Sequence, residues 1–465
     1  MRPVTIGQIE KATGGRIALG NKDALVTGVS TDSREAGEND LFIPLIGKNH
    51  DAHDFVFQSI QNGCRNFVVS RRELFNNLYY EKNLNAVFVE DTTCALQDLA
   101  ACYLNMLGII KVAVTGSTGK TTTKDMLKSI FSVKYRTYCT EKNFNNHIGV
   151  PLTIFSINED VQAGIFEMGM DKLGEIRRLA EIVKPDIGII TNIGVSHIEN
   201  LGSKEAIFKA KMELTKNFGK DNTLIVYKDD EFLNPQRIKG LYKLITAGSD
   251  GKADVILSDI EDSGTEGIAF TLKHDEKVQR FELAVPGLHN AFNAAVAAAA
   301  GLQYGISLEQ AADGLKNLKL TDKRLTVRSA DGIKVIDDTY NASPDSMRGA
   351  IDVLCSTDGM RRVAVLGDMF ELGEDSAEFH RHVGEYVGKR GVDLLVAIGE
   401  NAKNIAEAAE KTLGNENIKY YHKKEIFEEE MHHILEKGDV VLVKGSRGMA
   451  MDEIVRNIIE TGAKE

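Results

Sequence analysis

The sequence lacks tryptophan altogether and has only seven prolines and five cysteines among its 465 residues. An odd number of cysteines without CxxC spacing excludes a disulfide scaffold and indicates reduced thiols, as in a cytoplasmic protein. No stretch approaches the roughly 20 apolar residues of a membrane span, and the N-terminus lacks the apolar run of a signal peptide. Basic residues are in deficit, with 56 against 68 acidic ones and a net charge of −12, which argues against general binding to nucleic acid or to membrane surfaces.

What the sequence does contain is a phosphate-binding motif at residues 115–122. The β-branched apolar run at 109–114 predicts a buried strand before it, and helical spacing over 123–131 predicts a helix after it. Such a turn points backbone N–H groups at an anion, with its lysine on the β- and γ-phosphates and the next threonine hydroxyl on Mg²⁺. Val114 stands where the strict pattern has glycine, so a plain glycine turn is the alternative. The residues expected to hold ATP here are Thr115, Gly116, Ser117, Thr118, Gly119, Lys120, Thr121 and Thr122.

An α/β fold of three domains is predicted, because apolar strands alternate with helical stretches along the chain. Residues 1–107 form a smaller α/β unit, and residues 108–318 contain the phosphate-loop strand within a central parallel sheet of the P-loop ATPase type. The shorter alternating runs of 223–285 predict an antiparallel extension of that unit. Residues 319–465 predict a Rossmann-like doubly wound sheet, because three strand-to-glycine junctions follow one another. The other strands expected lie at 25–29, 41–45, 66–69, 86–89, 163–166, 186–190, 363–366, 394–398 and 440–443.

Polar residues follow several predicted strands, at the edge where parallel sheets bind ligands. Glu167 ends a strand beside the phosphate loop and is suited to hold Mg²⁺, although a solvated glutamate fits the pattern as well. His197 follows the next strand, where a lone histidine is more often structural. Lys209 and Lys211 lie on one predicted helix, and their periodicity alone favours a solvated basic face.

Further candidates lie on either side of the boundary near residue 319. Asn290 and Asn293 are one helical turn apart at the start of an alanine-rich helix. Their side chains are expected either to cap this helix or to recognise the edge of a nucleobase. Arg324 is placed to lean onto the nucleotide. Asp338 precedes a turn whose Asp-Asn-Ser-Pro composition is also ordinary turn chemistry.

The first unit has polar loops at 30–34 and 47–53 next to strand ends, where solvated turns are the alternative to a binding site. The residues by themselves therefore predict an α/β enzyme that uses Mg²⁺ and ATP, and they do not name its substrates.

Taken in order, the motifs closely resemble the Mur ligases of peptidoglycan synthesis, and the resemblance covers essentially the whole chain. Within that family, the runs DDTYNASP and GDMFELG favour the ligases that add D-alanyl-D-alanine to UDP-N-acetylmuramoyl-tripeptide. Two departures are Thr118, where the family often has asparagine, and Lys323, where it usually has glycine. The matching segments are TDSR at 31–34, TGSTGKTT at 115–122, NFNNHIGVPLT at 143–153, EMGM at 167–170, TNIGVSHIENLGS at 191–203, AKMEL at 210–214, PGLHNAFNAAVA at 286–297, DDTYNASPDSM at 337–347, LGDMFELGEDS at 366–376 and VLVKGSRGM at 441–449.

The resemblance implies roles for particular residues. Thr121, Glu167 and His197 match the Mg²⁺ ligands, and Lys211 matches a lysine that CO₂ carbamylates to hold a second Mg²⁺. Lys120, Lys211, His197 and Asp338 would carry the catalysis. Adenine would meet Asn290 and Asn293, while Arg324 and Asp338 would fold onto the nucleotide. Residues 1–107 would bind the UDP-linked substrate, with Ser30, Thr31, Asp32, Ser33, Arg34, Lys48, Asp51, His53, Asn145 and Asn146 near it. Residues 319–465 would bind the dipeptide, with Asp368 to Leu372, Ser446 and Arg447 near it.

The implied reaction is acyl activation in the cytoplasm by a monomeric enzyme, with an acyl phosphate formed from ATP and then attacked by the amine of the dipeptide. Two alternatives remain at this point. A folylpolyglutamate-synthase-like ligase shares the central domain and lacks the N-terminal unit. A nucleotide-driven regulatory switch would hydrolyse ATP and join nothing.

Overall fold

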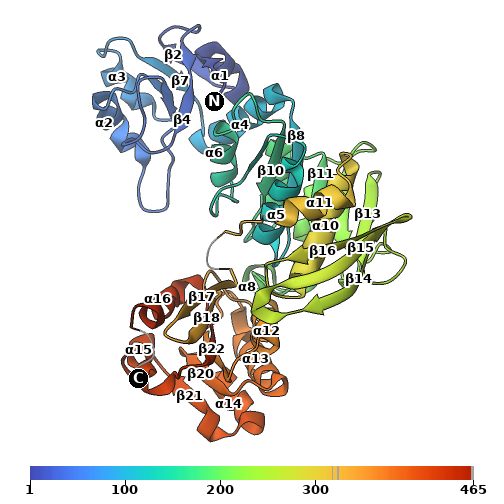
Figure 1. Ribbon diagram of the computed structural model, residues 1–465. Helices are drawn as coiled ribbons and strands as arrows, with labels where there is room; N and C mark the ends of the chain where they lie inside the picture. The colour runs from blue at the N-terminus through green and yellow to red at the C-terminus, as the bar shows by residue number, and fades with distance from the viewer. Residues whose placement is uncertain (317, 322–323, 462–465) are drawn as a thin grey trace.

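The computed structural model describes residues 1–316, 318–321 and 324–461, so Lys323 lies outside the described residues. It is an α/β protein with one sheet in each of three successive parts of the chain and a separate pair of short strands near the N-terminus. Figure 1 shows the N-terminal part in blue and the C-terminal part in red at opposite ends, with the central sheet between them. Among the described residues, no helix is long and apolar enough to span a bilayer.

The N-terminal sheet has the strand order β2-β7-β6-β5-β4, and only β2 runs antiparallel to its neighbour. The strand predicted at 25–29 is broken at Thr27, because β3 pairs with β1 and β4 pairs with β5. The strands are β1 (Val4–Thr5), β2 (Arg16–Leu19), β3 (Leu25–Val26), β4 (Gly28–Ser30), β5 (Asp40–Phe42), β6 (Asn66–Val69) and β7 (Asn85–Phe88). The helices are α1 (Ile6–Thr13), η1 (Ala52–Phe55), α2 (Val56–Gln61), η2 (Arg72–Leu74), α3 (Phe75–Leu78) and α4 (Thr92–Leu107).

The central sheet has the strand order β16-β15-β14-β13-β12-β11-β8-β10-β9. The predicted antiparallel extension over 223–285 is wrong for its first part, because β12, β13 and β14 continue the parallel sheet and only β15 and β16 run antiparallel. Alternating burial looks the same in both strand directions, so the sequence pattern did not contain this distinction. The strands are β8 (Ile110–Thr115), β9 (Thr137–Cys139), β10 (Ala163–Glu167), β11 (Ile187–Ile190), β12 (Thr223–Tyr227), β13 (Lys243–Gly248), β14 (Val255–Asp262), β15 (Ile268–His274) and β16 (Lys277–Leu283).

Helices cover both faces of the central sheet. On one face α5 packs against α10 and α11, over a core rich in alanine and branched side chains. On the other face α6 and α7 pack against α4, so the N-terminal part is anchored to the central sheet by a shared core. These helices are α5 (Lys120–Ser132), α6 (Gly149–Phe155), α7 (Glu175–Val183), α8 (Ile198–Leu201), α9 (Lys204–Met212), η3 (Glu213–Thr215), η4 (Gly264–Glu266), α10 (His289–Gln303) and α11 (Leu308–Lys316).

The C-terminal sheet has the strand order β17-β18-β22-β19-β20-β21, parallel except at β17. Separate hydrophobic cores lie on its two faces, so the predicted doubly wound sheet is confirmed. Its strands are β17 (Thr326–Ala330), β18 (Ile333–Asp337), β19 (Arg361–Gly367), β20 (Leu394–Ile398), β21 (Ile418–Tyr421) and β22 (Asp439–Lys444). Its helices are α12 (Pro344–Ser356), η5 (Gly373–Asp375), α13 (Ser376–Arg390), α14 (Lys403–Leu413), η6 (Asn415–Asn417), α15 (Lys424–Ile434), η7 (Arg447–Met449) and α16 (Asp452–Thr461).

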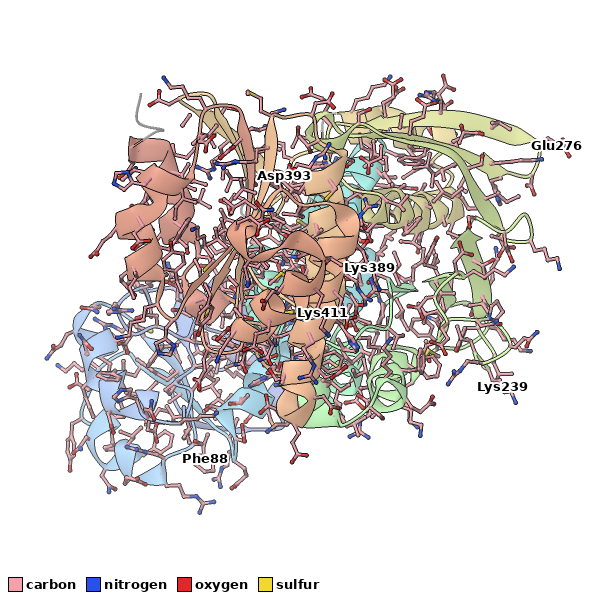
Figure 2. The ribbon with its side chains drawn as sticks, turned by 90° about the horizontal axis from the view of Figure 1, so that it is seen from below. Phe88, Lys239, Glu276, Lys389, Asp393 and Lys411 are labelled. Atoms are coloured by element: carbon pink, nitrogen blue, oxygen red, sulfur yellow. The ribbon has the colours of Figure 1, made fainter. Side chains whose placement is uncertain are left out.

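The hairpin of β15 and β16 lies far from the N-terminal part. Figure 2, seen from below, shows Glu276 at the tip of that hairpin and Phe88 of the N-terminal sheet on opposite sides of the molecule. The central and C-terminal parts do touch, because α12 contacts η4 and α8 contacts η5. The carboxyl ends of both sheets meet in this region, where Val195 follows β11 and its N–H lies 3.3 Å from Asp345 of α12.

Candidate functional site

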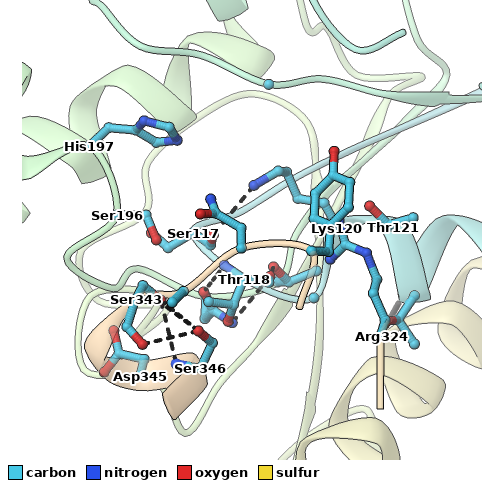
Figure 3. Close-up of a pocket in the computed structure, with 18 of the residues that line it drawn as sticks. Ser117, Thr118, Lys120, Thr121, Ser196, His197, Arg324, Ser343, Asp345 and Ser346 are labelled. Atoms are coloured by element: carbon cyan, nitrogen blue, oxygen red, sulfur yellow. Dashed lines mark hydrogen bonds between the residues drawn. The ribbon is translucent and has the colours of Figure 1, made fainter. Parts of the chain in front are cut away.

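A cavity of about 780 Å³ lies between the central and C-terminal parts of the chain. Its walls are the loop between β8 and α5, the segments that follow β10 and β11, the start of α10, and the turns after β18, β19 and β22. In Figure 3 the start of α12, with Ser343 and Asp345, faces Ser117 and Thr118 of the phosphate loop. The cavity therefore lies where a parallel sheet is expected to bind its ligand.

The phosphate loop is held in shape by the segment after β11. Thr191 donates its hydroxyl to the carbonyl of Thr118 at 2.6 Å, and Asn192 donates its side-chain amide to the Thr118 hydroxyl at 2.7 Å. Gly194 donates its N–H to the Ser117 hydroxyl at 2.8 Å. These bonds fix the loop before a ligand arrives, and Thr118 forms two of them with its own atoms, so threonine is a suitable residue at this position.

Lys120 begins α5 and curls back over the loop. Its ammonium donates to the carbonyl oxygen of Gly116 at 2.8 Å and to that of Ser117 at 3.3 Å. Burial lowers the pKa of Lys120, and the nearby guanidinium of Arg324 lowers it further while Glu167 opposes the shift. A cation that is desolvated in this way gains strongly when a phosphate anion reaches it.

Glu167 and Thr121 line the same cavity and are both buried. The Glu167 carboxylate accepts one bond from the side-chain amide of Asn145, at 2.8 Å. Its other oxygen is buried and has no hydrogen-bond partner among the described residues. A buried, unpaired carboxylate oxygen beside a phosphate loop fits a hard cation such as Mg²⁺, which takes one or two protein oxygens together with phosphate oxygens.

His197 also lines the cavity, with its backbone in the left-handed region at φ 64°. Its Nδ1 atom lies 2.7 Å from a carboxylate oxygen of Glu371 and 3.3 Å from one of Asp171. Glu371 belongs to the turn after β19, so this contact joins the C-terminal part to the central one. Within the described residues, no ready-made cluster of three or more histidine, cysteine or acidic ligands is present.

Lys211 differs sharply from its neighbour Lys209 on α9. Lys209 is exposed, as the periodicity suggested, whereas Lys211 is 1% exposed. Burial, together with the positive charge of Lys120, holds the pKa of Lys211 well below its usual range. A neutral amine is the form that reacts with CO₂, so the environment of Lys211 fits the implied carbamate, although Lys211 itself lies behind the cavity wall.

Asn290 and Asn293 are buried at the start of α10 and use their amides within the protein. Asn290 donates to the carbonyl of Pro286 at 2.7 Å, and Asn293 donates to the side-chain oxygen of Asn290 at 3.0 Å. The Asn293 amide also lies against Gly119, where a Cβ atom would collide with it. Asn290 and Asn293 therefore help to shape the phosphate loop, independently of any contact that they make with a ligand.

Two aromatic rings near these asparagines were missed by the sequence reasoning. Phe292 stacks on Tyr227 with ring centroids 4.5 Å apart, and both line the cavity. An apolar ring beside a phosphate loop is suited to a nucleobase. In the sequence, the only sign of this pair is that Phe292 lies between the two asparagines. By its spacing alone, Phe292 resembles an ordinary core residue.

The C-terminal wall contains Asp338, which is paired with a lysine that the sequence reasoning also missed. The Lys444 ammonium is 2% exposed and lies 2.5 Å from the Asp338 carboxylate. It follows a run of valines and a leucine at the end of β22, and that position was its only sequence signal. Arg324 and Arg447 also line the cavity, from turns at the two ends of this part of the chain.

Asp368 and Ser446 hold two turns together. Asp368 is buried, accepts a bond from the N–H of Ala402 at 2.7 Å, and does not line the cavity. Its carbonyl accepts from the N–H of Ser446 at 2.9 Å, and the Ser446 hydroxyl accepts from the N–H of Phe370 at 2.8 Å. The expected dipeptide side is therefore built from the exposed residues of these turns, Phe370, Glu371 and Arg447.

The candidates in the N-terminal part lie away from this cavity, and the structure does not bring them together with the phosphate loop. Arg34 pairs with Asp32 and lowers the pKa of Asp32 to about 2. Asp51 accepts from the imidazole of buried His53 at 2.6 Å and from Arg71 at 2.6 Å. Of the remaining N-terminal candidates, Ser30 ends β4, and Thr31, Ser33 and Lys48 lie in the same two loops, with Lys48 exposed and Ser33 buried.

Asn145 and Asn146 come from the central part and do line the cavity. Asn145 is bound to Glu167, as described above. The side-chain oxygen of Asn146 accepts from the N–H groups of Ile148 and Gly149 at 3.1 and 2.8 Å. Of the other predicted ATP residues, Thr122 lines the cavity, whereas Thr115 and Gly116 lie at the base of the loop.

Comparisons with known proteins agree with this architecture. Residues 114–301 match the Mur ligase middle domain, and residues 323–447 match the Mur ligase glutamate ligase domain. The UDP-N-acetylmuramoyl-tripeptide–D-alanyl-D-alanine ligase of Bacillus subtilis (strain 168) is 39% identical over 444 residues, which cover 95% of this chain and 94% of that protein.

Solved structures give the same result. A crystal structure of MurF from Acinetobacter baumannii has a TM-score of 0.91 and 31% identity, and covers 99% of this chain and 100% of its own. MurF from Thermotoga maritima, solved in complex with ADP, has a TM-score of 0.83 and 27% identity, and covers 94% of this chain and 97% of its own. With two matching domain models, a phosphate loop at the meeting of two sheets, and relatives of nearly equal length, the chain belongs to the Mur ligase family, in its UDP-N-acetylmuramoyl-tripeptide–D-alanyl-D-alanine ligase branch.

Proposed function

We propose that this protein is an ATP-dependent ligase that joins D-alanyl-D-alanine to UDP-N-acetylmuramoyl-tripeptide. The observation that carries the proposal is the likeness, at 39% identity over 95% of the chain, to a protein named for that reaction. The cavity between the phosphate loop and the C-terminal turns supports it, because a ligase needs ATP and an amine on two sides of one carboxylate.

We propose that each of the three successive parts of the chain binds a different substrate. Residues 1–107 bind the UDP-linked substrate through the loops around Asp32 and Asp51. Residues 108–318 bind ATP, with Lys120 on the phosphates and Asn290 and Asn293 behind the adenine. Residues 319–465 bind the dipeptide and close over the nucleotide.

In the proposed reaction, the terminal carboxylate of the tripeptide attacks the γ-phosphorus of ATP. A new carboxyl O–P bond forms, the bond to the β-phosphate oxygen breaks, and ADP leaves. The amine of the dipeptide then attacks the acyl carbon and loses a proton, and phosphate departs with the former carboxyl oxygen. Lys120 is placed to offset the charge of the triphosphate throughout, which is the main demand of phosphoryl transfer.

Mg²⁺ would be held by Thr121 and Glu167, with His197 and the carbamate of Lys211 as the further ligands that the family resemblance implies. When bound, two such ions neutralise phosphate charge and orient the attack. The unpaired oxygen of Glu167 and the depressed pKa of Lys211 support this assignment. The family resemblance implies that Asp338 contacts the nucleotide, and we propose that Lys444 holds it in position for that contact.

We further propose that the enzyme acts in the cytoplasm, where ATP is available and its five thiols remain reduced. A monomer suffices, because one chain supplies both walls of the cavity.

Phosphate release from ATP tests the function. We expect release only when UDP-N-acetylmuramoyl-tripeptide and D-alanyl-D-alanine are both present. Release with folate and glutamate would instead support a folylpolyglutamate-synthase-like ligase, and release that needs neither pair would support a nucleotide-driven switch.

A further inference from the structure

Two cations of the cavity share one aromatic ring. The guanidinium carbon of Arg324 lies 4.2 Å from the ring centroid of Tyr340, and that of Arg447 lies 5.7 Å from it. Both distances are within the range of a cation–π interaction. Because the two arginines come from opposite ends of the C-terminal part, Tyr340 is the point at which they meet.

Neither guanidinium has a carboxylate partner among the residues that the structure describes. The Nε atom of Arg324 is buried without any hydrogen-bond partner there. Most other arginines of the described chain do have an acidic partner, as Arg34, Arg71 and Arg361 do. Two unpaired cations that face a cavity are suited to bind anions from a ligand.

The arginines face different parts of the cavity. Arg324 is close enough to Lys120 for its charge to lower the pKa of that lysine, and Figure 3 shows it on the Lys120 and Thr121 side. Arg447 lies in the turn after β22, beside the turn that carries Phe370 and Glu371. One cation therefore belongs to the nucleotide side and the other to the amine side.

The turn that carries Tyr340 is fixed on both sides of this residue. The buried Lys444 ammonium donates to the Asp338 carboxylate at 2.5 Å and to the Asn341 carbonyl at 2.8 Å, on either side of Tyr340. The Asp337 carboxylate accepts from the Thr339 hydroxyl at 2.7 Å. These bonds hold the backbone around Tyr340, whose ring contacts the two guanidinium groups.

We propose that Tyr340 is a positioning residue whose ring holds Arg324 for the phosphates of ATP and Arg447 for the carboxylate of the incoming dipeptide. Occupation of one arginine by its anion fixes the shared ring and so favours the bound orientation of the other. The inference rests on the proposed function and adds a physical link between its two substrate sites.

The experiment compares Tyr340→Phe, Tyr340→Leu and Tyr340→Met with Tyr420→Leu, which removes a half-exposed ring from β21, away from the cavity. Tyr340→Phe keeps the ring face and is expected to behave like the wild type. Tyr340→Leu is expected to raise the KM for ATP about five- to thirtyfold, because the contact with Arg324 is desolvated, and the KM for D-alanyl-D-alanine about two- to fivefold, because Arg447 is exposed. The KM for UDP-N-acetylmuramoyl-tripeptide and the Tyr420→Leu enzyme should stay unchanged.

Binding measurements separate the linkage from catalysis. In the wild type, ADP is expected to tighten the binding of D-alanyl-D-alanine, and Tyr340→Leu should abolish that effect while the midpoint of unfolding stays near the wild-type value. In Tyr340→Met the side chain remains large but has no aromatic ring. This variant replaces Tyr340→Leu if the leucine variant does not fold.

Three results would overturn the proposal: an effect on kcat alone, an equal rise of all three KM values, or a loss in Tyr340→Phe as large as in Tyr340→Leu. The affinity for ADP, measured without the dipeptide, tests whether Tyr340 holds Arg324 for the phosphates. This test remains valid even if the wild type does not use D-alanyl-D-alanine. Failure of the proposed function and failure of this inference are therefore distinguishable.

Discussion

Lys211 and Lys209 lie two residues apart on α9, and burial alone separates them. Lys211 is enclosed beside the positive charge of Lys120, whereas Lys209 is exposed. Periodicity did not predict this difference, because α9 is short and has weak amphipathic character. The family resemblance singled out Lys211, and its buried amine with a depressed pKa supports the proposed carbamate.

The first prediction concerns this lysine pair. Lys211→Ala is expected to lower kcat about 100- to 1,000-fold, as loss of one charge-stabilising group in an active site does. Lys209→Ala is the matched control and should keep wild-type kcat. High bicarbonate should not restore Lys211→Ala, whereas a short-chain carboxylate should restore part of its activity. Wild-type kcat in Lys211→Ala would remove the carbamate assignment.

The second prediction concerns the stability of the ligand-free protein in CO₂-free buffer. The folded-state pKa of Lys211 is depressed, while an unfolded lysine titrates near about 10.4. Between these two values the unfolded state binds a proton that the folded state lacks, so the free energy of unfolding rises with pH. Lys211→Met lacks this dependence.

Urea titrations of both proteins at pH 7, 8 and 9 check the sign. The wild type should gain stability relative to Lys211→Met as the pH rises, and the gain should cease above the pKa of an unfolded lysine. If the difference in the free energy of unfolding between the wild type and Lys211→Met is constant from pH 7 to 9, the buried amine of Lys211 is not the source of the pH dependence.

The strand, loop and helix around the phosphate loop were predicted well, because the element is local in sequence. The strand expected at 109–114 is Ile110–Thr115, and the helix begins at Lys120. The direction of β12 and β13 was not predictable, since it depends on the return path of the chain. The sequence did not single out Lys444 or Tyr340 as candidates. A lysine at the end of a strand and a tyrosine in a turn are both common on protein surfaces.

The third prediction tests the loop through its glycines. Gly119 has φ 77° and Gly202 has φ 79°, so alanine strains both by about 1–2 kcal/mol. Only at Gly119 would a Cβ atom collide, with the side chain of Asn293, while at Gly202 the space is open. Gly119→Ala should lose about 100-fold in kcat/KM for ATP through a displaced loop.

Gly202→Ala controls for backbone strain in the third prediction. It should lower the midpoint of thermal unfolding and leave the KM for ATP unchanged. Equal losses of kcat/KM in the two variants would show that strain, and not the collision with Asn293, is responsible.

At the scale of the whole molecule, three α/β parts and the Mur-type order of their motifs were predicted and are confirmed by the structural likeness to MurF. Contacts between the parts could not be predicted, because they join residues far apart in sequence. Glu371 is one example, with its carboxylate near His197 and its carbonyl accepting from the N–H of Glu199 at 3.3 Å.

The fourth prediction is that Glu371→Ala opens the ligand-free molecule. The pair of His197 and Glu371 is partly open to solvent, so we expect it to contribute about 1 kcal/mol, which corresponds to about a fivefold change in the ratio of closed to open forms. The radius of gyration from small-angle scattering should rise, and Glu374→Ala, which changes an exposed glutamate of η5, should leave it unaltered. A radius that stays at the wild-type value in both would mean that other contacts hold the parts together.

In the proposed reaction, one carboxylate passes from the phosphate loop to the amine as an acyl phosphate. This transfer can be tested with UDP-N-acetylmuramoyl-tripeptide in which both oxygens of the terminal carboxylate are ¹⁸O, together with ATP and D-alanyl-D-alanine. We expect each phosphate released to contain one ¹⁸O atom from that carboxylate. Phosphate without ¹⁸O, formed while the peptide bond is made, would contradict the proposed reaction.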